Sequence, residues 1–200
     1  MVKYNSSGVC QWAQKAGGTA NDHGNGIVSD AAGNTYITGW FTGGTMAFGT
    51  INIAAPNALS EGFIAKYNTN GIPVWAFNGG SAGTEGGTGS CLDNTGSPVI
   101  SGSFDATFTL GTSTLTAAGG GDLFAAKFNS TSGANIWALE AGGTGADVAY
   151  KISADGAGNI YTAGNFTGTC TYGSNTTISS GLADIFLAKY NSAGTHQWSQ

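Results

Sequence analysis

The chain has 200 residues, of which 35 are glycine and only 8% are charged. Its net charge is −5 and its six basic residues are all lysine, so it lacks the arginine and lysine clusters with which proteins bind nucleic acids or anionic membranes. No apolar run approaches the roughly 20 residues of a membrane-spanning helix. We therefore expect no nucleic-acid partner and no membrane insertion. No signal peptide is visible at Met1, so an export signal would lie outside this sequence or be absent.

The hydrophobic residues make up 40% of the chain and the aromatic residues 11%, which is enough for a packed core. Small and polar residues dominate the remainder, a composition that favours a turn-rich β protein over a disordered chain. No helical periodicity is present. The sequence therefore predicts an all-β fold.

A sequence unit of about sixty residues occurs three times in the chain, and part of a fourth copy is also present. Each copy contains a lysine-aromatic-asparagine mark, and successive lysines lie 63, 61 and 62 residues apart. A tryptophan follows each mark nine or ten residues later. The marks begin at Lys3, Lys66, Lys127 and Lys189, and the tryptophans are Trp12, Trp75, Trp137 and Trp198. A repeat of this length made of strands indicates stacking of similar units.

In the first full copy, a glycine-rich loop leads through Asp22 to a strand of small residues that ends at Asp30. Gly33 follows in the turn, where we expect the Asp30 carboxylate to cap backbone N–H groups and the glycine to adopt positive φ. The second strand is predicted over residues 34–39. The same order recurs in the other two copies, with the turn acids Asp93 and Asp155 and the glycines Gly96 and Gly158.

A hairpin follows, in which apolar residues such as Met46 and Phe48 alternate with others, as in a half-buried strand. The third strand is predicted over residues 63–67. Both of its faces are largely apolar, so we expect it to be covered on both sides. A short turn then leads to the strand that carries Trp75.

Four main strands per copy, covered on both faces, are typical of a β-propeller blade, with the small-residue strand at the crowded axis. The extra hairpin explains why these copies of about 62 residues exceed the roughly 40–45 residues of a WD-type blade. A β-solenoid is the alternative, although its rungs are usually shorter. The predicted boundaries are a partial blade over 1–16 and blades over 17–78, 79–141 and 142–200, all within one propeller domain.

Nine of the eleven acidic residues occupy three positions that recur in every copy of the repeat, which we call columns. Only Asp105 and Glu140 lie outside these columns. The columns are Asp22, Glu85 and Asp147; Asp30, Asp93 and Asp155; and Glu61, Asp122 and Asp184. A glycosidase needs one acid–base pair in distinct environments and not three equivalent sets. We therefore interpret these acids as turn caps and lysine partners, and expect Glu61 and Lys66 to bind either backbone groups or each other across blades. We expect no enzyme and no catalytic residue.

Metal and cofactor motifs are also missing from the sequence. The Asp30, Asp93 and Asp155 turns lack the dense oxygen ligands of a calcium loop, and neither histidine belongs to a zinc-binding pattern. The three cysteines Cys10, Cys91 and Cys170 occupy three different columns, so no disulfide or metal site recurs per unit, and their redox state stays open. We expect no metal and no cofactor.

Three departures from the repeat are candidates for a specific function. Trp40 occupies a column that holds Ser103 and Asn165 in the other copies, and an exposed tryptophan can stack on a sugar ring. The alternative is that Trp40 packs on a neighbouring blade. His23 and Lys151 also depart from their columns, which is interpreted as variation of solvent-facing positions. Trp40 is thus the candidate glycan-stacking residue.

The pattern resembles the SBBP-type β-propeller repeat of bacterial secreted and surface proteins. The matching segments in the first copy run from Gly17 to Asp22, from Asp30 to Gly39 and from Glu61 to Asn68, and the third copy matches from Asp155 to Gly164 and from Asp184 to Asn191. The second copy departs at Ser97-Pro98. The resemblance covers nearly the whole chain. It implies a propeller in an extracellular or cell-surface setting, and it implies no catalytic residues.

Three copies are too few to close a propeller, which typically has four to eight blades. Both ends carry the lysine strand and the tryptophan strand, and open blade edges invite association. The expected partners are therefore further blades from a longer chain or other copies of itself. We expect a non-catalytic structural or interaction module, namely a scaffold, adhesin or filament subunit, with a carbohydrate-binding propeller as the alternative.

Overall fold

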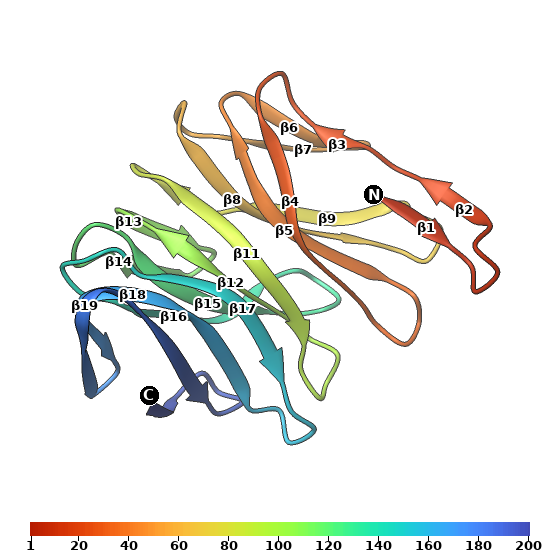
Figure 1. Cartoon of the computed structure of the whole chain (residues 1–200). Coiled ribbons are helices and arrows are strands. Elements are labelled where there is room, and N and C mark those ends of the chain that lie inside the picture. The colour runs from red at the N-terminus through yellow and green to blue at the C-terminus, as the bar shows by residue number, and fades with distance from the viewer.

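The computed structural model describes residues 1–200 apart from the side chain of Ser81. The described chain forms 20 strands, all paired antiparallel, and no helix, so the predicted all-β class is confirmed. The sheets follow one another in chain order, and the two chain ends lie on opposite sides of the stack (Figure 1).

Three four-stranded sheets make up most of the molecule, each with its strands in chain order once the hairpin is set aside. Sheet I contains β4 (Asp22–Ser29), β5 (Thr35–Thr42), β8 (Ser60–Tyr67) and β9 (Pro73–Asn78). Sheet II contains β11 (Glu85–Leu92), β12 (Pro98–Phe104), β15 (Asp122–Phe128) and β16 (Asn135–Ala141). Sheet III contains β17 (Val148–Ala154), β18 (Ile160–Tyr172), β19 (Asn175–Tyr190) and β20 (His196–Ser199).

Smaller sheets flank these three. The N-terminal sheet pairs β1 (Val2–Tyr4) with β2 (Cys10–Ala13). The predicted hairpins are present as β6 (Thr45–Phe48) with β7 (Ile51–Ala54), and as β13 (Thr107–Leu110) with β14 (Ser113–Thr116). A short strand joins each of them, β3 (Ala16–Gly17) or β10 (Gly80–Ser81). In the third copy the hairpin is continuous with β18 and β19, which are therefore 13 and 16 residues long.

The turns between the first and second strands form as the sequence predicts. Asp30 Oδ1 accepts the backbone N–H of Asn34 at 2.9 Å, and Gly33 adopts a φ of 83°. Asp93 and Asp155 cap their turns in the same way, with Gly96 and Gly158 at φ of 78° and 82°. The carboxylate satisfies backbone donors that the strands leave unpaired, which fixes the turn locally.

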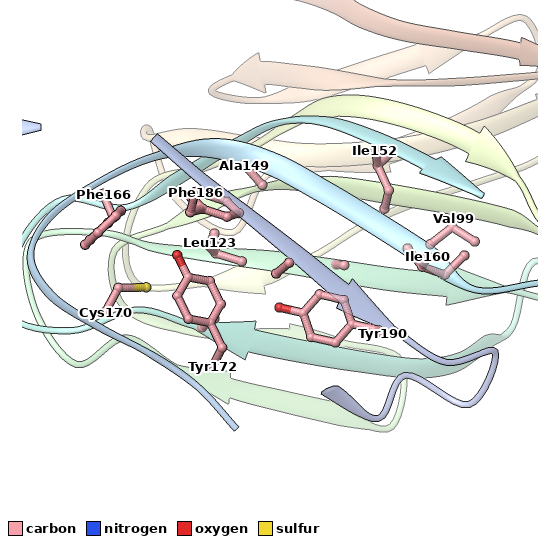
Figure 2. Packing of buried hydrophobic residues seen from close by; sticks show 13 residues of the cluster. Val99, Leu123, Ala149, Ile152, Ile160, Phe166, Cys170, Tyr172, Phe186 and Tyr190 are labelled. Carbon is pink, nitrogen blue, oxygen red and sulfur yellow. The ribbon is translucent and has the colours of Figure 1, made fainter. Parts of the chain in front are cut away.

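The core lies between the sheets and beneath the hairpins. The side chains of Met46 and Phe48 are buried on β6, as their alternation predicts. The cluster between sheets II and III joins Val99 and Leu123 of one sheet to residues such as Phe186 and Tyr190 of the other (Figure 2). Each sheet therefore depends on its neighbour for burial of its apolar face.

The first strand of each sheet carries a bulge at which the register with the second strand shifts. The bulged residues are Asn25, Thr88 and Tyr150. Asn25 Nδ2 donates to the carbonyl of Gly87 at 2.9 Å, and the Thr88 hydroxyl donates to the carbonyl of Ala149. The bulges thus tie the first strand of one sheet to the first strand of the next.

The expectation that the third strand is covered on both sides is wrong for sheet III. Ile64 of β8 and Leu123 of β15 are buried, with 1% and 0% of their surface exposed. On β19, Leu187 is 41% exposed and Ile185 is 86% exposed. The physical reason is that sheets I and II each have a following sheet against this face, whereas β19 has none in the described chain.

Candidate functional site

The repeated acids occupy three structural environments. The Asp30 column caps turns, and hydrogen bonds to these carboxylates help to hold the pKa of each below its usual value, for Asp155 at about 2. Asp105 and Glu140, outside the columns, accept backbone N–H groups of Thr84 and Thr116 at 2.6 and 2.7 Å. These acids stabilise loops and hairpins.

The other two columns meet across the sheet interfaces, which the sequence alone did not predict. Glu61 of β8 and Glu85 of β11 are 0% and 1% exposed, and their carboxyl groups have no hydrogen-bond partner among the described residues. The two carboxyl groups are close enough that each influences the pKa of the other. Burial raises the pKa of Glu61 to about 7 and, with the nearby charge of Glu61, that of Glu85 to about 9. The pair therefore retains a shared proton at neutral pH.

Asp122 of β15 and Asp147 form the corresponding pair between sheets II and III. Both are buried, and burial raises the pKa of each, for Asp147 to about 6. Backbone N–H groups of Gly143 and Thr167 donate to Asp147. Hydrogen bonds therefore stabilise the charged form of this aspartate pair more than that of the glutamate pair. Asp22 and Asp184, at the two ends of the series, are half-buried and have no facing carboxyl group in the described chain.

Of the two alternatives expected for Glu61 and Lys66, the backbone contact is present for Lys66 and the ion pair is absent, because the two side chains meet different neighbours. Glu61 faces Glu85, while Lys66 Nζ donates to the Ser130 carbonyl at 2.6 Å. A repeated acid does pair with a repeated lysine in sheet II, where Asp93 lies 2.5 Å from Lys127 Nζ. Strand register and not spacing along one strand decides which lysine meets which acid.

Trp40 and His23 lie opposite each other on β5 and β4, and their rings stack with centroids 4.1 Å apart. The two departures from the repeat are therefore one cross-strand pair, and each covers a face of the other. Trp40 also borders a hollow of about 300 Å³ between sheets I and II. The polar residues around it are Asn25, Ser60, Thr84, Glu85, Thr88 and Ser103.

Lys151 is exposed on the first strand of sheet III. It borders an open hollow of about 350 Å³ together with the three bulged residues Asn25, Thr88 and Tyr150. The first strands of the three sheets thus lie next to one another, in the order β4, β11 and β17. No group of three or more His, Cys, Asp or Glu side chains that could hold a metal ion occurs in the described part of the chain.

The three cysteines are free thiols in the structure. Cys170 is fully buried in the core between sheets II and III, where it packs as a small apolar residue. Burial raises the pKa of the Cys91 and Cys170 thiols to about 12. Such thiols stay protonated at neutral pH and are weak nucleophiles and weak metal ligands.

A contact that we call the tryptophan–turn joint links each sheet to the turn of the next. Trp12 Nε1 and Lys3 Nζ both donate to the carbonyl of Thr69, at 3.0 and 3.1 Å. The Trp12 ring lies against Gly71 of the same turn, so closely that a Cβ on this glycine would be 2.7 Å from the ring. The turn is therefore clamped by two donors and one aromatic face.

The joint recurs at the two following interfaces with small changes. Between sheets I and II, Lys66 donates to Ser130 and the Trp75 ring lies against Gly133. Between sheets II and III, Trp137 Nε1 donates to Ser192 at 3.2 Å, while Lys127 is held by Asp93 instead. The ring of Trp137 lies against Gly194 of the same turn. The repeated tryptophans and lysines thus hold successive sheets together.

Each end of the chain presents one unpartnered half of this joint. At the C-terminal end, Trp198 is 37% exposed, and Lys189 Nζ lies over the Tyr161 ring with no carbonyl acceptor among the described residues. At the N-terminal end, the turn at residues 5–8 is exposed, and no atom lies within 4 Å of the position that a Cβ on Gly8 would take. Beside this turn, β1 has β2 as its single strand partner in the described chain.

A hollow of about 410 Å³ with both apolar and polar lining also lies at the N-terminal end. It is bordered by the N-terminal sheet and sheet I, including Val2, Ile27, Ile37, Met46 and Phe63. Ile27 is 61% exposed, whereas Ile152 in the same column of sheet III is 9% exposed because it packs on sheet II. Both end faces therefore expose side chains whose counterparts are buried in the interior.

Comparison with known proteins agrees with this geometry. Residues 136–168 match the family model for the SBBP beta-propeller repeat. The chain is also similar to an uncharacterized WD repeat-containing protein of Acanthamoeba polyphaga mimivirus, with 27% identity over 110 residues. That similarity covers 52% of this chain and 8% of the relative, so the chain spans a small part of that protein. The family match shows an SBBP β-propeller repeat at residues 136–168, within a chain of antiparallel sheets.

Proposed function

We propose that the chain is a non-catalytic structural and interaction module of an extracellular or cell-surface bacterial repeat protein, where it serves as a scaffold, adhesin or filament subunit. In this proposal each four-stranded sheet with its hairpin is one propeller blade of about 62 residues. The blades span 17–78, 79–141 and 142–200, and residues 1–16 are the outer strands of a further blade. The repeat family and the WD-repeat relative support a repeat interaction module.

The observation that carries the proposal is the repeated tryptophan–turn joint. In each of its three occurrences a tryptophan ring of one sheet lies against the turn glycine of the next sheet, so the repeated residues build contacts between successive sheets. The repeated acids support the non-catalytic part of the proposal, since the buried pairs are closed to solvent and the others cap backbone groups.

Surface location is tested by labelling the producing cells with an antibody raised against the 200-residue chain. We expect labelling of intact cells, or the protein in the medium, and loss of the surface signal after brief protease treatment. An antibody to a cytoplasmic protein of the same cells serves as the control for lysis. Labelling that appears only after permeabilisation would contradict the extracellular assignment.

Carbohydrate binding is the second candidate function, and the hollow beside Trp40 is the observation that favours it. An aromatic ring next to hydroxyl and amide groups provides the stacking and hydrogen bonding that sugars require. His23 already covers one face of the Trp40 ring, so a sugar would have to use the remaining surface.

We predict that Trp40→Ala abolishes any glycan binding, because it removes the stacking surface of the hollow. Glycan-array screening of the wild-type chain, followed by calorimetric titration of the best glycan, measures this. Trp198→Ala is the matched control, since it removes a partly exposed tryptophan far from the hollow and should leave glycan affinity unchanged. A wild-type chain that binds no glycan on the array would remove this candidate.

A further inference from the structure

We propose that Asn70 is a site of spontaneous deamidation, and that the tryptophan–turn joint around it controls how fast the reaction proceeds. The residue lies in the turn that Trp12 and Lys3 clamp. One product of the reaction loosens this joint, so the contact between the N-terminal sheet and sheet I weakens with time. The proposal concerns a modification site and does not depend on where the protein is located or on what it binds.

Deamidation begins when the backbone nitrogen of the following residue attacks the side-chain amide of an asparagine. Glycine in the following position hinders the attack least, because it has no Cβ and its backbone is the most flexible. The sequence contains three asparagine-glycine pairs, which begin at Asn25, Asn70 and Asn78. The structure distinguishes the three pairs by the hydrogen bonds of the amide and by the element that holds the backbone.

The amides of Asn25 and Asn78 are held in place. Asn25 lies at the bulge of β4, and its Nδ2 donates to the carbonyl of Gly87 at 2.9 Å. Asn78 ends β9, and its Nδ2 donates to the carbonyl of Ala54 at 3.0 Å. Both asparagines belong to strands of sheet I, so attack on either amide requires part of a four-stranded sheet to open.

Asn70 differs in both respects. Its side chain is exposed, and its amide makes no hydrogen bond within the part of the chain that the structure describes. The attacking nitrogen belongs to Gly71, whose N–H donates to the carbonyl of Asn68 at 2.9 Å in the same turn. Opening this turn frees the nitrogen and costs less free energy than opening a sheet, because fewer contacts are lost.

The joint itself requires the reactive glycine. Gly71 has a φ of 75°, and a Cβ at this position would lie 2.7 Å from the Trp12 ring, so no other residue fits without strain. The residue before the glycine is not restricted in this way. The corresponding positions in the other turns hold Ser7, Ser132 and Ala193. An asparagine before the clamped glycine is therefore specific to this copy of the repeat.

The reaction balances with water as its single co-reactant. The Gly71 nitrogen attacks Cγ of Asn70, a C–N bond forms, and the bond from Cγ to Nδ2 breaks. The proton of the Gly71 N–H passes through water to Nδ2, which leaves as ammonia. Water then opens the cyclic imide at one of its two carbonyls, which gives aspartate or isoaspartate. Isoaspartate adds one carbon to the backbone path, so the turn no longer places Gly71 against the Trp12 ring.

The joint slows the attack because it holds the turn closed. The carbonyl of Thr69 accepts hydrogen bonds from Trp12 and Lys3, and the Trp12 ring covers the glycine. While the turn stays closed, the N–H of Gly71 remains bonded to the carbonyl of Asn68. Loss of Trp12 removes a donor and the aromatic face together. The turn then opens more often, and deamidation accelerates.

The test incubates the folded 200-residue chain at neutral pH and follows each asparagine-glycine pair by peptide mass spectrometry. We expect Asn70 to deamidate at least about tenfold faster than Asn25 and Asn78, because a turn opens more often than a strand within a sheet. Asn70→Ser is the control. It introduces the residue that the turns at Ser7 and Ser132 carry, so it should remove the reaction and keep the joint.

Trp12→Ala tests whether the joint controls the rate, and we expect it to accelerate deamidation of Asn70 several-fold. Trp198→Ala is the matched control, since it removes a tryptophan on β20 far from this turn and should leave the rate unchanged. Circular dichroism confirms that each variant is folded, and Lys3→Met replaces Trp12→Ala if the latter is not. In the aged wild-type protein, we expect the backbone amide of Gly71 to exchange its hydrogen faster in the isoaspartate fraction than in fresh protein.

The assignment of the site is overturned if Asn70 deamidates no faster than Asn25 and Asn78 in the folded chain. Control by the joint is overturned if Trp12→Ala, or Lys3→Met in its place, deamidates at the wild-type rate. An equal acceleration by Trp198→Ala would also overturn it, because general destabilisation would then explain the effect. Equal hydrogen exchange at Gly71 in the isoaspartate fraction and in fresh protein would contradict the loosening of the joint.

Discussion

Replacing Gly39 with alanine is expected to lower the free energy of unfolding by about 3 kcal/mol, because the second strand passes too close to the first for a side chain. A Cβ on Gly39 would lie 1.8 Å from the carbonyl oxygen of His23, so the backbone of β4 or β5 must move. The same contact recurs at Gly102 and Gly164, at 1.9 and 1.8 Å. Urea unfolding followed by tryptophan fluorescence measures the effect.

Gly24 provides the matched control, since it lies directly opposite Gly39 on β4. No atom lies within 4 Å of the position that its Cβ would take, so Gly24→Ala should change the free energy of unfolding by less than about 0.5 kcal/mol. Equal effects of the two substitutions would show that glycine composition, and not close approach of the strands, explains the pattern.

The glutamate pair between sheets I and II is expected to make the protein less stable as the pH rises. The pKa of Glu61 and Glu85 is raised by burial in the folded state to about 7 and about 9, so the folded protein holds protons that the unfolded chain releases. The stability from this pair is fully present below the unfolded pKa and is lost as the pH rises through these values. Between about pH 5 and pH 9 we expect a loss on the order of several kcal/mol.

Glu85→Gln should remove most of this pH dependence, because the neutral amide can donate to Glu61 without a proton that titrates. At about pH 8 the variant is expected to unfold at a higher temperature than the wild type, by several degrees. Glu140→Gln is the control, because Glu140 is exposed and lies outside the pair, and its pH profile should follow that of the wild type. Thermal unfolding over the pH series measures both, and parallel wild-type and Glu85→Gln profiles would contradict the shared proton.

The acids of the turns act in the opposite direction. The pKa of Asp30, Asp93 and Asp155 is lowered in the folded state, so their stabilisation is present above the unfolded pKa and is lost as the pH falls through the folded value. The protein should therefore be most stable in mildly acidic solution, above the range where the turn acids protonate and below the range where the glutamate pair ionises.

The contact between His23 and Trp40 could have been predicted from the sequence by comparing their positions in the repeat. His23 and Trp40 depart from the repeat in the same copy, and the turn capped by Asp30 sets the register that places them opposite each other. The glutamate pair was not accessible in this way. Glu61 and Glu85 lie on different sheets, and their contact depends on how one sheet stacks on the next.

The amino-acid sequence by itself determined the repeat, the order of strands and the turns, because alternation and Asp-to-Gly turn chemistry act between residues close together in the chain. The tertiary structure decided which repeated acids face each other, which carbonyl each tryptophan clamps and which end faces stay exposed. Those contacts join residues from different copies, and stacking of whole sheets brings them together. The same residue types are therefore buried in the interior and free at Trp198 and Gly8.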